Sequence, residues 1–178
     1  MTRLLDDLLD LSFLESGQVI LKEQTSNLRD ILDRAVASAG VPQSEDGLRV
    51  LRTPAAENVM IRSDTDRLSQ VFINLISNAH KYCTAAQPAL TITVTEGNGQ
   101  VDIDFVDNGK GIPRGQQDNI FEKFYRLSDY SSAGSAGLGL AICKEVMARL
   151  GGTISYVPGQ AGTAFRVSLP VERVTQAA

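Results

Sequence analysis

The sequence contains few residues that bind metals or form disulfides, and it has no long apolar run. Its 178 residues include two cysteines, Cys83 and Cys143, and no tryptophan. Two cysteines so far apart suit neither a zinc module nor a secreted disulfide framework, so we expect a reducing compartment. No stretch approaches the roughly 20 apolar residues that span a membrane. The first residues also lack the basic and apolar regions of a signal peptide.

Basic charge is also scarce. The chain has 17 Lys and Arg against 21 Asp and Glu, which gives a formal net charge of −4. No basic cluster suits a nucleic-acid backbone or an anionic membrane, so we expect neither partner for this chain. The length fits one domain of about 150 residues with a short appendage. A domain of that size needs no disulfide or structural metal, and a cytoplasmic enzyme or binding domain remains.

The hydrophobic pattern predicts both helices and strands. Apolar residues at helical spacing predict helices over residues 1–16, 27–39, from 65 onward, and 138–150. Shorter apolar or alternating runs predict strands over residues 19–21, 48–52, 59–62, 90–95, 101–105, 153–157 and 164–169. The alternation on both sides of Gly97-Asn98-Gly99 is typical of an antiparallel hairpin with one buried face. This mixture predicts the α+β class, with a sheet covered by helices.

The first helix carries a wide apolar stripe that includes Leu4, Leu8 and Leu11 and ends at Gly17. An isolated helix of this length is marginal in water, so the stripe must pack on something. One interpretation is packing on the domain that follows. The other, which we favour, is that the segment forms half of a helical hairpin that dimerises.

Polar residues on the helix from residue 65 form a second stripe. Asn74, Asn78 and Lys81 are spaced by four and three, which places them within about 60° of each other around the helix. A carboxamide oxygen suits a hard cation such as magnesium, and an ammonium group suits a phosphate oxygen. Taken alone, this stripe is better explained as a solvated helix face.

The end of the strand at 101–105 carries an acidic residue. Alternation turns Asp107 toward the buried face, where a carboxylate without partners is costly. It is explained if a ligand donor, such as the exocyclic amine of adenine, binds it. Gly109 and Gly111 would allow close backbone approaches beside it. The alternative is an ordinary turn between strand and loop.

Two further segments are candidates for phosphate contact. Glycines that include Gly137 and Gly139 open the helix at 138–150, where exposed amides favour an anion. They match neither the P-loop nor the dinucleotide fingerprint, and close helix packing is the alternative. Before them, Phe121 and Phe124 could anchor a small-residue lid over residues 128–136, with Arg126 free to reach a phosphate. A core helix followed by an ordinary surface loop explains this second segment equally well.

Together and in this order, the motifs resemble the catalytic ATP-binding domain of bacterial two-component sensor histidine kinases. The motifs are Asn74-Leu-Ile-Ser-Asn78-Ala-His-Lys81-Tyr82, Asp107-x-Gly109-x-Gly111-Ile112-Pro, Phe121-x-x-Phe124-Tyr-Arg126 and Gly137-Leu138-Gly139-Leu-Ala-Ile, with Gly162-Thr163 near the end. The match covers about residues 1–170. It implies the two-layer α/β sandwich shared with gyrase, a heat-shock chaperone family and MutL, preceded by a short helical segment.

The resemblance also implies a domain organisation and partners. Residues 1–17 resemble the end of the dimerisation and phosphoacceptor hairpin, 18–172 the catalytic ATP-binding domain, and 173–178 a flexible tail. The full-length protein would form a homodimer through that hairpin and pass phosphate to a response-regulator receiver domain. Contact with a membrane would come only through parts outside this chain, and a parent protein anchored in the inner membrane is left open.

For ATP and Mg²⁺, the resemblance implies specific residues. Asn78 would bind the metal, Asn74 would face the phosphates, and Lys81 would contact phosphate. Arg126 would reach the terminal phosphate, so Asn74 and Arg126 are the catalytic candidates. Backbone amides of the second glycine motif would hold the phosphate chain, at Gly137, Leu138 and Gly139.

At the other end of the nucleotide, Asp107 would bind the adenine amine. Gly109 and Gly111 would shape that wall, and Tyr82 would contact ribose or adenine. The remaining nucleotide contacts implied are Ile112, Phe124 and Thr163.

Three features bear on the reaction. The family often has a hydroxyl residue before the second glycine motif, where this chain has Ala136. Its one histidine, His80, precedes Lys81 inside the nucleotide helix, where we expect a partly packed side chain and no acceptor. The chain should therefore be part of a longer kinase and should not phosphorylate itself. Hydrolysing relatives have a glutamate at the position of Asn74, and an amide cannot take up that proton, which favours transfer over hydrolysis.

The sequence thus predicts a domain that binds Mg-ATP and donates the γ-phosphoryl group to a histidine outside this chain. One alternative is a serine kinase of the anti-sigma-factor type on the same fold. The other is a non-catalytic, nucleotide-gated interaction module. The leucine-rich helix before Gly17 favours the histidine kinase.

Overall fold

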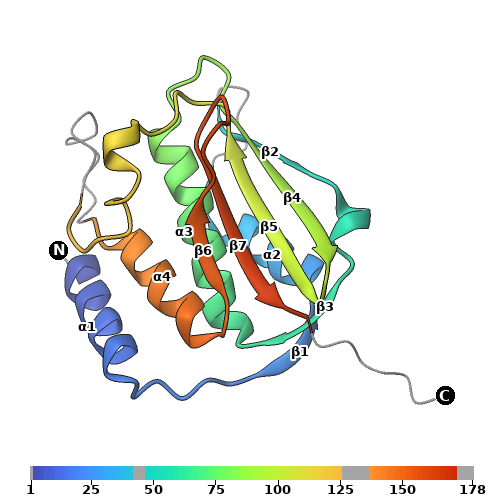
Figure 1. Ribbon diagram of the computed structural model, residues 1–178, viewed down its shortest axis with the longest axis vertical. Coiled ribbons are helices and arrows are strands. Elements are labelled where there is room, and N and C mark those ends of the chain that lie inside the picture. Colours follow the sequence, from blue (N-terminus) through green and yellow to red (C-terminus); the bar gives the residue numbers. More distant parts are fainter. Residues whose placement is uncertain (1, 42–46, 126–136, 172–178) are drawn as a thin grey trace.

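The protein is a sheet with helices on one face, seen in a computed structural model that describes residues 2–41, 47–125 and 137–171 (Figure 1). The helices are α1 (Thr2–Ser16), α2 (Leu28–Ser38), α3 (Thr65–Tyr82) and α4 (Gly139–Arg149), with short 3₁₀ turns at η1 (Pro54–Glu57) and η2 (Arg114–Gln116). The strands are β1 (Gln24–Asn27), β2 (Arg49–Arg52), β3 (Met60–Ser63), β4 (Ala89–Gly97), β5 (Gln100–Asp107), β6 (Thr153–Tyr156) and β7 (Ala164–Pro170).

Five strands form the main sheet, in the order β2-β4-β5-β7-β6. All neighbours are antiparallel except β2 and β4, which are parallel. The predicted hairpin is β4–β5, with Leu90 opposite Asp107 at one end and Gly97 opposite Gln100 at the other. A second, two-stranded sheet pairs β1 with β3. The predicted fold, a two-layer sandwich after a short helical segment, is confirmed.

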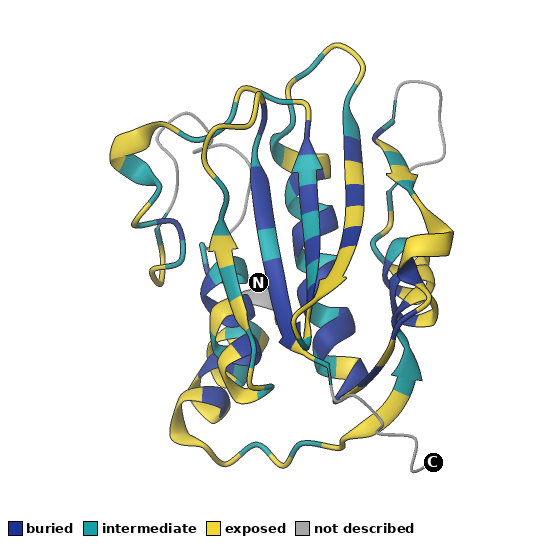
Figure 2. Ribbon diagram, turned by 45° about the vertical axis from the view of Figure 1, so that its right-hand side comes forward, coloured by how far each residue is buried: buried dark blue, intermediate teal, exposed yellow. Residues whose placement is uncertain are grey.

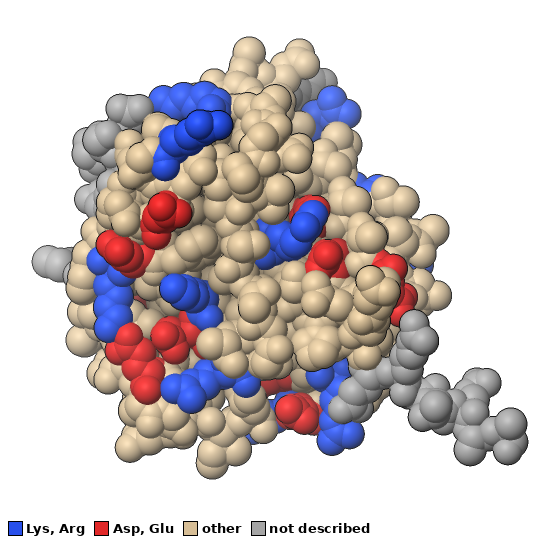
Figure 3. Space-filling view, viewed as in Figure 1, with Lys and Arg blue, Asp and Glu red and all other residues tan. Residues whose placement is uncertain are grey.

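The core lies between the sheet and the helices. Alternate residues of β4 and β5 are buried against α3, and the rings of Phe72 and Phe105 lie 5.4 Å apart across this layer. Figure 2 shows the resulting alternation of buried and exposed positions along the strands. The outer face is polar, with Arg166 donating to both oxygens of Asp104. Basic and acidic side chains lie close together on the view in Figure 3, instead of forming a field of one sign.

Helix α3 extends from the small sheet toward the loops and carries most of the polar candidates. Asp64 caps its first turn by accepting the Arg67 N–H at 3.1 Å. The apolar stripe predicted for this helix is buried, from Leu68 to Ala79. Asn74 and Asn78 are half-buried beside that stripe, as predicted from their spacing.

The predicted strand at residues 19–21 is wrong, because the first strand begins only at Gln24. Its partner β3 ends at Ser63, which pairs with Gln24. The next residue, Asp64, turns the chain into α3 and accepts the backbone N–H of Lys22 at 3.0 Å. Among the described residues, no strand therefore pairs with residues 19–21, and Ile20 is 87% exposed.

Helix α1 packs on the rest of the protein along one side. Leu11 and Leu14 are buried, and Arg149 of α4 donates to the Leu14 carbonyl oxygen at 2.8 Å. Asp10 accepts from Arg67 at 2.8 Å on the α3 side. The interpretation that we did not favour, packing of the stripe on the following domain, thus holds for this side of the helix. Other apolar side chains of α1 remain exposed, namely Leu5, Leu8, Leu9 and Phe13.

Candidate functional site

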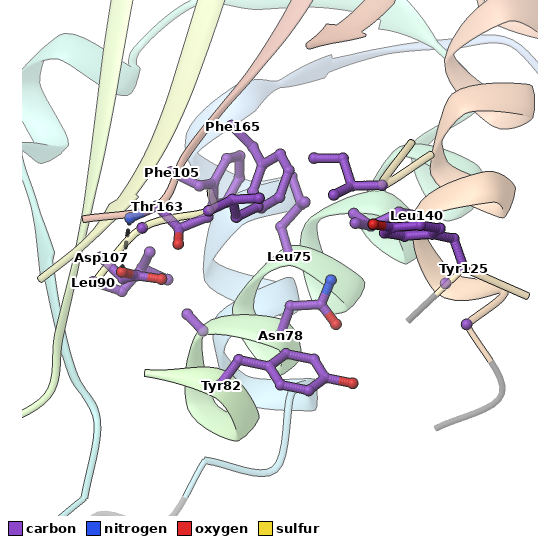
Figure 4. A pocket seen from close by; sticks show the side chains of 16 residues that line it. Leu75, Asn78, Tyr82, Leu90, Phe105, Asp107, Tyr125, Leu140, Thr163 and Phe165 are labelled. Carbon is purple, nitrogen blue, oxygen red and sulfur yellow. Dashed lines mark hydrogen bonds between the residues drawn. The ribbon is translucent and has the colours of Figure 1, made fainter. Parts of the chain in front are cut away.

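A cavity of about 110 Å³ opens between the second half of α3, the ends of β4 and β5, β7 and the start of α4. One water molecule requires roughly 10–15 Å³, so this space is ligand-sized and not a packing defect. The structure brings eight predicted site residues together around it (Figure 4), and these are Asn78, Tyr82, Asp107, Gly111, Ile112, Gly137, Gly139 and Thr163.

Asp107 lies at the end of β5 and is 9% exposed. Its Oδ1 accepts the backbone N–H of Gly109 at 2.8 Å and that of Thr163 at 3.0 Å. Within the described residues no donor is bonded to its other oxygen, although the residue lines the cavity. A nearly buried carboxylate is therefore fixed by one oxygen and offers the other as an acceptor to a ligand.

Gly162 makes the close contact that fixes this carboxylate. A Cβ atom there would lie 1.9 Å from the Asp107 carbonyl oxygen, so no other residue fits without moving the backbone. The same approach places the neighbouring Thr163 N–H on Asp107. Gly111, at φ +77°, is also close to Gly162, since a Cβ atom at Gly111 would lie 3.4 Å from the Gly162 carbonyl oxygen. The sequence marked Gly162 as part of a motif but gave no reason for this approach.

The remaining walls of the cavity are apolar, and sequence reasoning did not assign them to the site. They include Leu75, Ala79, Leu90, Phe105, Ile120, Tyr125, Leu140 and Phe165. Periodicity marked several of these as core residues, and core and cavity positions have the same pattern. A slot with apolar walls and one acceptor at its end suits a planar, partly polar ring.

The three polar residues predicted on one face of α3, Asn74, Asn78 and Lys81, lie in different environments. Asn78 lines the cavity, whereas Asn74 and Lys81 do not. The Asn74 amide instead donates to the Cys143 sulfur of α4 at 3.6 Å. Lys81 is exposed at the end of the helix. Only Asn78 therefore reaches the cavity directly from this stripe.

The chain on both sides of residues 126–136 is held together by backbone contacts. Phe124 donates its N–H to the Gly137 carbonyl oxygen at 3.1 Å. Gly137 has φ +76°, and a Cβ atom there would lie 2.7 Å from the Tyr125 carbonyl oxygen. Phe124 itself is exposed and has φ 62°. The predicted lid at 128–136, Arg126 and Ala136 lie outside the described residues.

Three other predicted residues do not line the cavity. Gly109 donates to Asp107 from behind it, and Leu138 is buried at the start of α4. His80 is exposed, so the prediction of a partly packed ring is wrong. The apolar stripe turns inward at Ala79, and one further residue around the helix points to solvent.

The two thiols differ in environment. Cys143 is fully buried in α4, and burial raises the pKa of its thiol to about 12. Cys83 is half-buried beside Asn108. Neither lines the cavity.

We expect Cys143 to make the protein less stable at alkaline pH. Below about pH 9 the thiol is protonated in both the folded and the unfolded chain. Above it the unfolded chain loses the proton first, so the free energy of unfolding falls by up to about 1.4 kcal/mol per pH unit until the folded thiol ionises. Denaturant titrations between pH 8 and 11 should show the stability of the wild type falling relative to Cys143→Ala. A constant difference between the two proteins would contradict this expectation.

A family model described as histidine kinase-, DNA gyrase B-, and HSP90-like ATPase matches residues 63–173. Curated relatives match nearly the whole chain. The sensor protein KdpD of Escherichia coli K12 is 35% identical over 95% of this chain and 19% of its own length. The probable sensor histidine kinase TcrY of Mycobacterium tuberculosis is 37% identical over 96% and 36%, and BaeS of Escherichia coli K12 is 31% identical over 99% and 38%. The chain thus spans well under half of these relatives.

Solved structures have a similar fold. Full-length ShkA in complex with AMPPNP gives a TM-score of 0.79 at 25% identity, over 94% of this chain and 35% of that one. The Acinetobacter baumannii histidine kinase AdeS gives 0.75 at 24% identity, over 96% and 78%. Over residues 2–41, 47–125 and 137–171, no helix is long and apolar enough to cross a bilayer.

Proposed function

The chain belongs to the histidine kinase-, DNA gyrase B- and HSP90-like ATPase family and is the catalytic ATP-binding part of a histidine kinase. From this we propose that it donates the γ-phosphoryl group of Mg-ATP to a histidine outside the chain. The observation that carries the proposal is the nearly buried Asp107 carboxylate, with an acceptor oxygen left over at one end of an apolar slot. Asn78 lines the same slot from α3.

Adenine would bind at the Asp107 end. Its exocyclic amine would donate to the oxygen that the Gly109 and Thr163 amides leave open. Apolar side chains of the slot would cover the ring faces, and Tyr82 would contact the ring or the ribose. Such a site combines apolar burial with one directional hydrogen bond, which sets the orientation of the ligand.

The phosphates and the metal would lie toward Asn78 and the start of α4. A carboxamide oxygen is a suitable ligand for Mg²⁺, which commonly uses few protein ligands together with substrate phosphates. The described residues include no group of three or more His, Cys, Asp or Glu side chains that could hold a metal. When bound, Mg²⁺ would neutralise charge on the phosphates. Gly137 and Gly139 line this end of the cavity, where amides at a helix start favour an anion.

The remaining phosphate contacts are proposed from the motifs alone. We assign Lys81 and Arg126 to phosphate, Asn74 to the neighbourhood of the phosphates, and Leu138 to the backbone cradle. Phe124 and Ile112 would border the nucleotide. In such a site the protein contributes mainly positioning and charge neutralisation, as phosphoryl transfer requires.

The cavity favours transfer over hydrolysis. Asp107 is the one carboxylate among the described residues that line it, and both its oxygens serve the adenine end. A general base for water would have to lie within hydrogen-bond reach of the attacking water at the other end. Asn74, an amide, occupies the motif position where hydrolysing relatives have glutamate. ATP would therefore persist until an acceptor arrives.

The acceptor and partners would come from the longer protein. We propose residues 1–17 as the end of a dimerisation and phosphoacceptor hairpin, 18–172 as the catalytic domain and 173–178 as a tail. The exposed apolar side chains of α1, Leu5, Leu9 and Phe13, would meet the other helices of that hairpin in a homodimer. The phosphoryl group would then pass to a response-regulator receiver domain in the cytoplasm.

Magnesium-dependent binding of ATP and ADP to the isolated chain tests this proposal. We expect a dissociation constant in the micromolar range or weaker, because ordering of loops around a ligand opposes affinity. Calorimetry with and without EDTA should show heat of binding that depends on Mg²⁺, and Asn78→Ala should remove most of this dependence. Absence of binding up to millimolar Mg-ATP would overturn the assignment.

A further inference from the structure

Asn108 joins the two sides of the proposed adenine slot although it is exposed and does not line the slot. Its Oδ1 accepts the backbone N–H of Ala89 at 2.8 Å and the Cys83 thiol at 3.2 Å. Its Nδ2 donates to the Gln87 carbonyl oxygen at 2.9 Å. Its backbone N–H also donates to the Ala89 carbonyl oxygen at 3.1 Å. One side chain thus binds Cys83, Gln87 and Ala89 in segment 83–89, which comprises the connection between α3 and β4 and the first residue of β4.

Two of the three partners of the Asn108 side chain, Cys83 and Ala89, are adjacent to residues that line the slot, and so is Asn108 itself. Tyr82 precedes Cys83, Leu90 follows Ala89, and Asp107 precedes Asn108 itself. Hydrogen bonds that meet at Asn108 therefore connect the residue after α3 to the end of β5, which carries the Asp107 carboxylate. Gly109 lies near Cys83 on the same side, and a Cβ atom there would make an ordinary van der Waals contact with the Cys83 sulfur at 3.6 Å.

We propose that Asn108 is a positioning residue for base specificity. It holds the end of α3 at the spacing that lets the open oxygen of Asp107 meet the amine of adenine while apolar side chains cover the ring. The inference rests on the proposed function, since it assigns a role in the same nucleotide site. It adds a residue that acts through Asp107 and Tyr82 and touches no ligand.

Base specificity is the property that this role controls. Adenine presents an amine where guanine presents a carbonyl oxygen, so a correctly placed carboxylate selects adenine. A hydrogen bond weakens steeply when its distance and angle depart from their optimum. Release of segment 83–89 should therefore weaken ATP binding more than GTP binding. Affinity for the triphosphate chain, held at Asn78 and the start of α4, should change little.

The test measures dissociation constants of the 178-residue chain for Mg-ATP and Mg-GTP, together with the melting temperature. We expect Asn108→Ala to lose about tenfold in the preference for ATP over GTP, as the loss of one to several modest hydrogen bonds allows. Asn108→Asp keeps the acceptor for Ala89 and Cys83 but loses the donor to Gln87, so it should keep part of the preference. A general loss of stability would not make the preference for ATP in Asn108→Asp fall between those of Asn108→Ala and the unmodified chain.

Asn98→Ala is the matched control, because Asn98 lies at the opposite end of the β4–β5 hairpin and has φ 54°. Alanine strains this turn, so the melting temperature should fall while the preference for ATP stays unchanged. An unchanged preference in Asn108→Ala, or an equal loss in Asn98→Ala, would overturn the proposed role of Asn108. Failure of the unmodified chain to bind either nucleotide would instead overturn the proposed function.

Discussion

An Asp107→Asn variant is expected to lose most of its preference for ATP over GTP while it still binds the triphosphate chain. One carboxylate oxygen accepts from the Gly109 and Thr163 amides, so the amide that replaces it must keep its oxygen there. Its NH₂ group then faces the amine of adenine, and two donors meet. Such a mismatch costs about 1–3 kcal/mol, which is a loss of affinity between about fivefold and about 150-fold. Guanine, with an acceptor at that position, would gain a partner.

Asp104→Asn provides a control on the same strand. Asp104 pairs with Arg166 on the outer face of the sheet, at 2.8 Å, and lies away from the cavity. The variant loses a charge of the same sign from β5 but should keep the ATP preference. Fluorescence competition against a labelled ATP analogue would measure both variants. An equal preference for ATP in Asp107→Asn and in the unmodified chain would mean that Asp107 does not discriminate between adenine and guanine.

The family and the fold were predicted from the order of four motifs, each of which was ambiguous alone. Asp107 illustrates why the prediction succeeded. Alternation along β5 placed its carboxylate at the buried end of the strand, and the structure confirms this burial. Period-two alternation is fixed by the backbone, so a short pattern determines which face a residue occupies.

Details that depend on contacts between distant segments were not predictable in the same way. The strand at residues 19–21 was wrong because β-branched and apolar residues form a strand only where a partner is available, and β3 ends at Ser63. Asn74 and Asn78 have the same residue type and helical spacing, yet only Asn78 lines the cavity. The two asparagines differ because the Asn74 amide donates to the Cys143 sulfur of α4, a contact that depends on where α4 packs.

The apolar lining of the cavity was missed for a related reason. Leu75 and Phe105 follow the periodicity of core residues, and they do form the core on one side. Whether a core residue also borders a cavity depends on whether side chains from distant segments fill the space that it faces, and no local pattern encodes this. Gly162 was similarly underestimated, because its close approach to Asp107 joins residues far apart in the sequence.

Our proposal that the acceptor histidine lies outside this chain has the largest expected effect. Incubated alone with γ-labelled ATP, the chain should acquire no acid-labile, base-stable phosphate. Transfer requires a nucleophile held nearly in line and within about 3–3.5 Å of the γ-phosphorus. His80 is exposed on α3 and does not line the cavity, and it is the sole histidine of the sequence. Its ring is directed by the helix that would bind the nucleotide.

The measurement that tests the central proposal most directly is phosphoryl transfer to an added hairpin helix. The first helix of the proposed hairpin, with the proposed acceptor histidine, should be supplied in cis or as a separate polypeptide that pairs with α1. Labelling is expected to appear on that helix, to require Mg²⁺, and to disappear when its histidine is replaced. Phosphohistidine at His80 in the isolated chain, abolished by His80→Ala with nucleotide binding intact, would contradict the proposal and make this chain a self-sufficient kinase.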